Sequence, residues 1–414
     1  MLKTWFEITL WKRILGALVL GAVVGSIWGE GAGSIRWIGD VFINLIRMIV
    51  VPLVFVTLVS GLIAMGDPKK LGSLGFKTLA LYIGTTAFAI VIGLTMATII
   101  EPGTGVSFAG AEPREIQAAQ SLQERLIGII PQNPVAALAS GNMLSIIFFA
   151  IFFGAALLMV GEKGKPIASI IDAGSEVMLK MTHMVMEVAP FGVFALISFV
   201  VGNGGISQLL NVLPLVGAFI AGCALHLIIT HGGLMKFVLK LSPVKFFKGA
   251  VDAQMVAFST SSSSATLPVT MSVAENNMGI KPPVASSVLP LGSTINMDGT
   301  ALYVGIVAVF AAQALGISLG LTEYALIALT TTLVSIGTAA VPSASLFLLA
   351  AVMDVIGVDG AQTAIIVGFL FPFDRPLDMM RTVVNVTGDL SVSTAVAKWE
   401  GEFDEEAFNA DNVE

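Results

Sequence analysis

Apolar stretches long enough to cross a bilayer recur along the whole chain. A transmembrane helix needs about 20 predominantly apolar residues. In lipid the backbone must satisfy its own hydrogen bonds, so such stretches are expected to be helical. In the first half of the chain the predicted helices lie near residues 10–28, 36–65, 74–99, 136–160, 168–202 and 208–241.

The pattern changes after residue 242, where apolar stretches are broken in the middle by small and polar residues. Hydroxylated runs interrupt two stretches, 243–275 and 318–357. Each is followed by a spanning segment with a polar motif at its centre, NMDG in 283–313 and NVTGD in 361–397. Paired interruptions of this kind indicate a transporter binding site, because non-helical backbone survives in a membrane only where it is buried or lines a cavity.

The last of these segments carries its polar residues on one face. At about 100° per residue, six polar side chains fall within an arc of about 100°. A charge at the bilayer centre costs roughly 2.5–3.5 kcal/mol, so such residues are expected to face the protein interior and to serve a ligand or ion. The six are Asp374, Asp378, Arg381, Thr382, Asn385 and Asp389.

The composition of the chain excludes an ordinary soluble domain, and the distribution of charge predicts where the protein is located. Hydrophobic residues make up 56% of the chain and charged residues 12%, against about 25% charged in soluble domains. Lysines and arginines gather in alternate loops, which predicts an all-α polytopic protein of the plasma (inner) membrane with both termini in the cytoplasm. Residues 399–414 are expected to form an acidic, disordered tail. Cys223 is the single cysteine, which excludes an internal disulfide. His183, His226 and His231 lie apart from the polar motifs and are interpreted as structural.

Four motifs resemble those of the sodium-coupled glutamate/aspartate transporters: ATLPVT, INMDGTALY, SIGTA-V-P and DMMRTVVNVTGDL. The resemblance covers nearly the whole chain and is densest in its last third. It implies eight transmembrane helices plus two re-entrant helical hairpins in inverted repeats, an elevator-type mechanism and a homotrimer. The domains that it implies are scaffold helices 1–2 in 1–70, transport-domain helix 3 in 71–100, an extracellular loop and scaffold helices 4–5 in 101–205, and the remaining transport domain in 206–398.

Arg381 is the centre of the expected substrate site. Its planar guanidinium group suits a carboxylate, and Asp378 on the same face suits an ammonium group. The resemblance assigns these two residues to the side-chain carboxylate and the amine of an acidic amino acid. A structural Asp–Arg ion pair is the alternative. The further substrate contacts that the resemblance implies are Ser262, Ser263, Thr300, Val341, Thr382 and Asn385.

Sodium ions are bound by several oxygen atoms, and the resemblance implies three sets of ligands. The first consists of Asn296, Asn385, Asp389 and the carbonyl of Gly292. The second consists of Tyr82, Thr85, Thr86, Asn296 and Asp298. The third is built mainly from carbonyl groups of Thr294, Met297, Ser335, Ile336 and Thr338.

The chain departs from the family pattern at both hairpin tips. Ser261 stands where archaeal members carry an arginine, and an arginine appears instead at Arg375. We expect Arg375 to supply the missing charge and to neutralise Asp374 or Asp378. In the second hairpin, added Cβ atoms restrict the backbone where glycine is frequent. These positions are Ala340, Ser343 and Ser345.

The resemblance therefore predicts a symporter, not an enzyme, that takes up L-aspartate or L-glutamate with co-transported sodium and uses the second hairpin as its gate. A proton-coupled carrier of the same fold is an alternative, since Asp298 and Asp374 are titratable. A C4-dicarboxylate carrier is another, although Asp378 argues against it, as Arg381 argues against neutral cargo. An ion channel is less consistent with the sequence, because paired hairpins around a closed charged site favour a carrier over a pore. An intramembrane serine hydrolase is also less consistent, because no histidine or lysine lies in the same cluster as the serine run at 259–264 to activate it. No nucleic-acid partner is expected.

Overall fold

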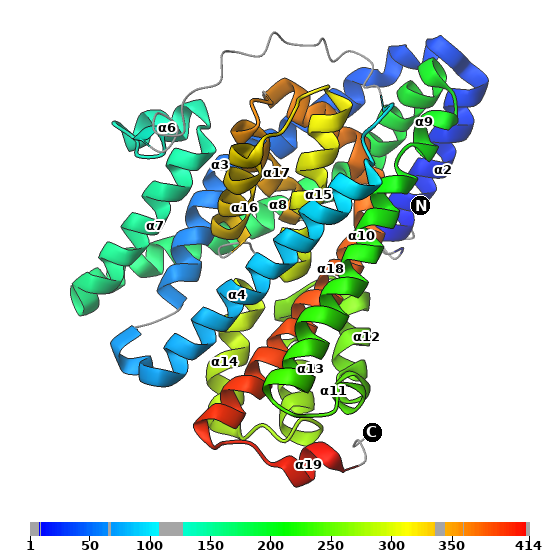
Figure 1. The fold of residues 1–414 in the computed structure, drawn as a ribbon. Helices are drawn as coiled ribbons and strands as arrows, with labels where there is room; N and C mark the ends of the chain where they lie inside the picture. The colour runs from blue at the N-terminus through cyan, green and yellow to red at the C-terminus, as the bar shows by residue number, and fades with distance from the viewer. Residues whose placement is uncertain are drawn as a thin grey trace.

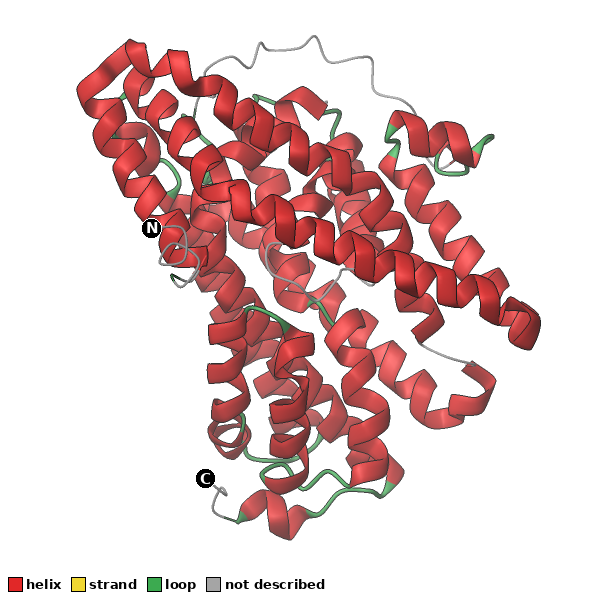
Figure 2. Cartoon of the chain, turned by 180° about the vertical axis from the view of Figure 1, so that it is seen from behind, coloured by secondary structure: helices red, strands yellow, loops and turns green. Residues whose placement is uncertain are grey.

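The computed structural model describes residues 8, 10–64, 68–106, 127–335, 344–358 and 360–410. Within these residues every regular element is a helix (Figures 1 and 2), which confirms the predicted all-α class. Five helical runs are long and apolar enough to cross a membrane. They are Lys12–Ile63, Ser73–Ile100, Ser145–Gly204, Leu213–Val238 and Pro282–Ala314.

The first half of the chain forms long helices close to the predicted positions. Its α-helices are α2 (Leu10–Trp28), α3 (Arg36–Ala64), α4 (Pro68–Ile100), α6 (Pro134–Ser140), α7 (Met143–Val160), α8 (Lys165–Gly204), α9 (Ser207–Leu210) and α10 (Leu213–Leu225). Short 3₁₀ segments, η1 (Gly29–Ile35) and η2 (Gly161–Gly164), connect some of them. Two π-helical segments follow α10, η3 (His226–Gly232) and η4 (Leu234–Val238).

The second half is built from shorter helices that end where the sequence is interrupted, followed by one long helix. They are α11 (Pro243–Gly249), α12 (Val251–Thr260), α13 (Ser263–Asn276), α14 (Pro282–Ile295), α15 (Asp298–Ala314), α16 (Leu321–Ser335), α17 (Ala344–Val355), α18 (Gly360–Glu400) and α19 (Glu405–Asn409). The predicted 243–275 stretch thus becomes α12 and α13, and these two helices pack against each other. The predicted 283–313 segment becomes α14 and α15, which separate at Asn296 and Met297.

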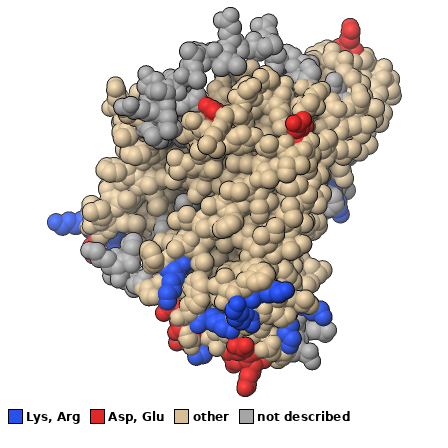
Figure 3. All heavy atoms as spheres, in the orientation of Figure 1, with Lys and Arg blue, Asp and Glu red and all other residues tan. Residues whose placement is uncertain are grey.

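Two groups of helices make up the molecule. In the first, α2 and α3 pack against α8, and α7 packs against α3. In the second, α18 packs against α12, α13, α14 and α15, while α4 and α10 cover α15 from another side (Figure 1). On the face shown in Figure 3, charged side chains gather mainly at the lower end, and a band almost free of charge lies above them. That distribution suits a protein whose middle lies in lipid.

The breaks between helices have local causes. Ser261 adopts a left-handed conformation with φ +52°, which ends α12. The Ser262 side chain then accepts a hydrogen bond from the Ala265 N–H and caps α13. At the other break, Met297 leaves helical geometry before Asp298 begins α15.

The acidic tail is a correction to the sequence prediction, because residues 401–410 are ordered against the body of the protein. The Asp404 N–H donates to the Gly279 carbonyl at 2.8 Å, and Phe408 of α19 is buried. Hydrogen bonds from Lys77 and Ser73 hold the pKa of the Glu400 carboxyl below its usual value. The charge count predicted disorder but overlooked the two phenylalanines, Phe403 and Phe408, which pack together.

Candidate functional site

The predicted polar face of α18 is buried in the second group of helices. All six of its residues lie inside the protein, and Arg381 has no exposed surface. The side chains therefore face α12, α14 and α15 rather than lipid, as the sequence prediction requires. The buried six are Asp374, Asp378, Arg381, Thr382, Asn385 and Asp389.

Arg381 lies between two carboxylates and an aromatic ring. Its Nη2 donates to Asp374 Oδ1 at 2.7 Å and to Asp378 Oδ1 at 2.9 Å, and its Nε donates to Asp378 Oδ1 at 3.2 Å. The guanidinium carbon lies 4.2 Å from the centre of the Tyr303 ring, which gives a cation–π contact. Nη1 makes no hydrogen bond with the described residues. The guanidinium group is held in place and still has a free donor edge.

Arg375 approaches the same cluster from the rim. Its Nη1 lies 3.6 Å from Asp378 Oδ2, and its side chain is mostly buried. Asp374, the other expected partner, is instead paired with Arg381. The cluster thus contains two arginines and two aspartates, and the Asp–Arg pairing considered from the sequence is present within it.

The first predicted sodium set forms one connected group between α14, α15 and α18. Asn296 Nδ2 donates to Asp389 Oδ1 at 3.0 Å and to the Asn385 carbonyl at 3.1 Å. The Asn385 side chain accepts from the Gly299 N–H at 2.8 Å and so ties α18 to the start of α15. Gly292 lies so close that a Cβ atom there would be 2.5 Å from Asp389 Oδ1. The group is rich in oxygen atoms and contains a buried carboxylate.

The second predicted set surrounds Asp298, the first residue of α15. Thr86 of α4 donates to Asp298 Oδ1 at 2.6 Å, so two of its predicted members are in contact. Thr85 Oγ1 lies 3.4 Å from Asn296 Oδ1, which connects this set to the first. The Tyr82 hydroxyl donates to the Val288 carbonyl at 3.1 Å. Tyr82 therefore supports α14 instead of contacting Asp298 directly through its hydroxyl hydrogen.

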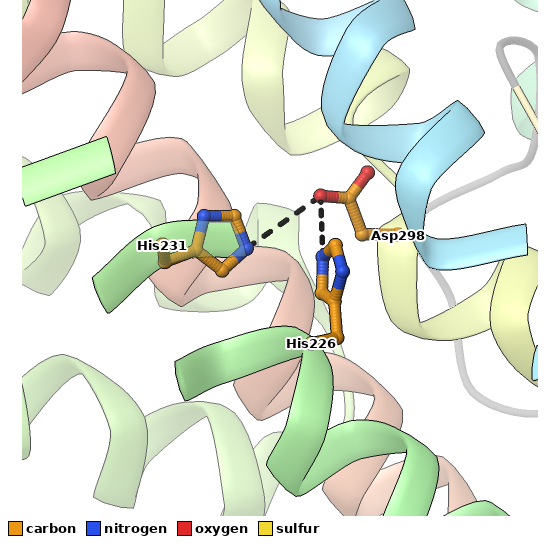
Figure 4. A group of neighbouring side chains, drawn as sticks. All are labelled: His226, His231 and Asp298. Atoms are coloured by element: carbon orange, nitrogen blue, oxygen red, sulfur yellow. Dashed lines mark hydrogen bonds and ion pairs between the residues drawn. The ribbon is translucent and has the colours of Figure 1, made fainter. Parts of the chain in front are cut away.

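Two histidines complete the surroundings of Asp298, and their placement corrects the expectation that they lie apart from every polar group. His226 Nε2 is 3.1 Å and His231 Nε2 is 3.7 Å from Asp298 Oδ2 (Figure 4). On an α-helix, residues five apart lie about 140° from each other. In the π-helical η3, the hydrogen bonds run from residue i to i+5 and place both rings on one side. The sequence pattern gave no signal for the π turn. Only the third histidine, His183, is exposed.

The remaining predicted residues lie on the helices around these groups. Thr300 is buried in the first turn of α15, and Ser335 is buried at the end of α16. Ser262 and Ser263 stand at the start of α13, which packs against α18. Thr294 lies in the last turn of α14, beside the break at Met297. The predicted residues outside the described part of the chain are Ile336, Thr338 and Val341, together with Ala340 and Ser343.

Comparison with known proteins gives matches over nearly the full length. A sequence model of the sodium:dicarboxylate symporter family matches residues 10–399. The chain is 38% identical over 403 residues to the proton/sodium-glutamate symport protein of Bacillus subtilis, covering 94% of this chain and 92% of that protein. It is 36% identical over 412 residues to the proton/glutamate-aspartate symporter of Escherichia coli, with 95% and 93% covered. It is 33% identical over 406 residues to a C4-dicarboxylate transport protein of Rhodospirillum rubrum, with 95% and 89% covered.

Proposed function

The chain belongs to the sodium:dicarboxylate symporter family, and from this premise we propose that it is a secondary active symporter for L-aspartate or L-glutamate driven by a sodium gradient. It is an integral membrane protein and not an enzyme. Its similarity to glutamate and glutamate-aspartate symporters supports the class of substrate. Because those relatives are named for protons as well as sodium, the coupling ion needs its own argument.

The buried Arg381 cluster is the observation that carries the substrate assignment. An arginine without exposed surface is costly unless its charge is used or paired. Here Nε and Nη2 are paired with Asp374 and Asp378, whereas Nη1 makes no hydrogen bond with the described residues. A carboxylate group of the substrate would bind the guanidinium group of Arg381. The ammonium group of the same substrate would then pair with Asp378. A ligand with both charges, an acidic amino acid, satisfies the two residues together.

The substrate also needs contacts that orient its second carboxylate. Thr382 and Asn385 follow Arg381 along the buried face of α18, and Thr300 lies in the first turn of α15. Ser262, Ser263 and Val341 are assigned to the two hairpin tips. Arg375 adds a second positive charge 3.6 Å from Asp378. It offsets the charge of Asp378 and in this way compensates for the serine at position 261.

Sodium coupling rests on the oxygen atoms around Asp389. Asn296, Asn385, Asp389 and the Gly292 carbonyl form the first proposed site, because a hard cation prefers carboxylate, amide and carbonyl oxygens. The third site uses Thr294, Met297, Ser335, Ile336 and Thr338. The second set, Tyr82, Thr85, Thr86, Asn296 and Asp298, differs from both. Its carboxylate faces two imidazole rings, and nitrogen atoms are poor ligands for sodium.

The proposed architecture has eight transmembrane helices and two re-entrant hairpins in inverted repeats, and it works as an elevator. Residues 71–100 and 206–398 form the transport domain, and residues 1–70 and 101–205 form the scaffold. The helix breaks at Ser261 and Asn296 support interrupted helices within the transport domain. The second hairpin closes once cations and substrate have neutralised the buried acids. The protein is proposed to be a homotrimer in the inner membrane, with both termini in the cytoplasm.

Uptake of labelled L-aspartate into proteoliposomes tests the proposal. One set of vesicles carries an inward sodium gradient and a matched set carries only a proton gradient. We expect uptake that needs sodium and is competed by L-glutamate. Uptake with protons alone would keep the substrate and remove the sodium sites. Competition by succinate as strong as by glutamate would favour the C4-dicarboxylate alternative, because succinate has no ammonium group for Asp378.

A further inference from the structure

We propose that His226, His231 and Asp298 form a binding site for a transition-metal ion of the zinc type. The three side chains come from η3 and α15, and all three are fully buried. Their possible ligand atoms lie within 4.8 Å of one another, and they form the one such group of three among the described residues. Figure 4 shows the two imidazole rings directed at the same carboxylate.

The two distances to the carboxylate are close to what a tetrahedral ion needs. Zinc binds imidazole nitrogen and carboxylate oxygen at about 2.0–2.2 Å, so neighbouring ligand atoms lie about 3.3 Å apart. His226 Nε2 and His231 Nε2 are 3.1 Å and 3.7 Å from Asp298 Oδ2. The rings stand nearly perpendicular, at 83°. The three ligand atoms lie within 4.8 Å of one another, so the two rings must rotate toward each other to bring all three to binding distance.

Each histidine is oriented by a hydroxyl group on its other ring nitrogen. Thr230 Oγ1 lies 3.0 Å from His226 Nδ1, and Ser391 Oγ lies 2.7 Å from His231 Nδ1. Metal-binding histidines are held in this way, because a partner on the second nitrogen fixes the ring and its tautomer. Thr230 belongs to η3 and Ser391 belongs to α18, so the two rings are oriented by two different helices.

His231 has an unpaired nitrogen atom that points at the carboxylate. Ser391 also lies 3.0 Å from the Gly388 carbonyl and donates its single hydroxyl hydrogen there. In the tautomer that matches this donation, Ser391 accepts a hydrogen bond from His231 Nδ1–H, and Nε2 carries a lone pair. Nε2 is buried and makes no hydrogen bond with the described residues. A lone pair and an anionic oxygen 3.7 Å apart repel each other, and a cation between them removes that repulsion.

The ligand types decide which cation fits. Two of the three atoms are imidazole nitrogens, which suit zinc, cobalt, nickel and copper, whereas sodium prefers oxygen ligands only. The Thr86 hydroxyl, bonded to Asp298 Oδ1, is an oxygen available as a further ligand. An ion bound here withdraws Asp298 from the second sodium set. Zinc is therefore expected to inhibit sodium-driven uptake, a consequence that rests on the proposed function.

Direct metal binding to the full-length protein, purified in detergent with a histidine-free affinity tag, tests the site. Zinc binding is measured by competition calorimetry, and Co²⁺ is used as a probe because its visible spectrum reports tetrahedral nitrogen and oxygen ligands. We expect one ion per chain in the wild type and in His183→Gln, the matched control with an exposed histidine. His231→Gln is expected to lose the cobalt spectrum, and Ser391→Ala to weaken zinc binding roughly 10–100-fold.

The outcomes separate the metal site from the transport assignment. A folded wild-type protein that binds neither ion, or equal binding by wild type and a folded His231→Gln variant, overturns the site. Equal thermal unfolding midpoints in the two proteins show that loss of binding is not loss of fold. Zinc that binds but leaves sodium-driven uptake unchanged overturns the competition at Asp298. Zinc binding in a protein without any aspartate uptake supports the site and counts against the proposed function alone.

Discussion

Helices α8 and α18 are nearly equal in length, at 40 and 41 residues, but they treat charge in opposite ways. The acids and lysines of α8 lie at the surface or are partly exposed, as Asp172, Glu176 and Lys180 illustrate. The residues that α8 buries against α2 and α3 are apolar or small, apart from Thr182 and Ser198. Helix α18 buries Arg381 and three aspartates instead.

The difference in buried charge supports the proposal that the binding site lies on α18. Removing one partner of a buried ion pair costs about 3–5 kcal/mol, and replacing the whole pair by apolar residues is often stabilising. Buried charges are therefore poor devices for holding two helices together. Helix α8 buries no charged residue of its own, and its one strong ion pair, to the buried Arg13 of α2, uses the half-exposed Glu187; packing alone therefore does not account for the buried charges of α18. The charges of α18 are best explained by ligands that bind there.

Arg381→Ala is expected to have the largest effect on aspartate uptake. It removes the buried positive charge of α18, a kind of residue that α8 does not bury. The variant leaves Asp374 and Asp378 buried without their main cation and removes the proposed partner of the substrate carboxylate. Loss of one partner of a buried, hydrogen-bonded charge pair costs about 2–5 kcal/mol, so we expect uptake to fall at least about 30-fold. The measurement is initial uptake of labelled aspartate at equal protein incorporation.

Two further variants show whether the loss of uptake is caused by removing the planar guanidinium donors or by removing the positive charge alone. Arg381→Lys keeps the positive charge but not the planar donor edge, and it is expected to remain strongly impaired. Lys180→Ala on the exposed face of α8 is the matched control and should transport normally. Normal uptake by Arg381→Ala would refute the substrate site and reduce the Arg381 cluster to a structural ion pair.

The comparison also shows what the sequence could predict. A regular α-helical repeat describes α18, so the buried face from Asp374 to Asp389 could be located from spacing alone. The same repeat failed for His226 and His231, because η3 is a π-helix and its turn is wider. The tail was mispredicted because its many acids outweighed Phe403 and Phe408, whose packing depends on tertiary contacts. The buried face of a regular helix could be predicted from the spacing of its residues. Contacts between distant segments could be predicted only where a sequence motif indicated them.

Asp389→Asn is the second test, because it removes a buried charge from α18 while keeping the side-chain shape. Asp389 Oδ1 accepts from Asn296 in the first proposed sodium site. We expect the sodium concentration for half-maximal aspartate binding to rise roughly 10–100-fold, or about 1.4–2.8 kcal/mol. Calorimetric titration of the purified protein at several sodium concentrations measures this. Glu176→Gln on α8 is the control, and an unchanged sodium dependence in Asp389→Asn would remove Asp389 from the site.

Gly292→Ala tests the close approach of α14 to both α4 and α18, because its Cβ would meet the Tyr82 hydroxyl as well as Asp389. The added Cβ would lie 2.5 Å from Asp389 Oδ1, so the carboxylate or α14 must shift. We expect a loss of stability of about 1–2 kcal/mol and weaker sodium binding. On α8, a Cβ at Gly174 would meet only Val56, at 3.7 Å, so Gly174→Ala should leave the unfolding midpoint unchanged or raised. Equal midpoints for the two variants would mean that α14 lies less close to α4 and α18 than the structure shows.

Glu187→Gln should have the smallest effect, and it tests whether the one strong ion pair of α8 is dispensable for transport. Arg13 Nη1 donates to Glu187 Oε2 at 2.6 Å, and Nη2 donates to Oε1 at 3.2 Å. The Glu187 side chain is 43% exposed and that of Arg13 is 4% exposed, so water screens the glutamate but not the arginine. Because the glutamine amide oxygen can still accept from Arg13, the expected cost is only about 1 kcal/mol. We expect a midpoint shift of no more than about 3 °C and uptake close to wild type. If uptake fell as far as in Arg381→Ala, charge on α8 would be as functional as charge on α18, and the contrast between the two helices would not separate scaffold from site.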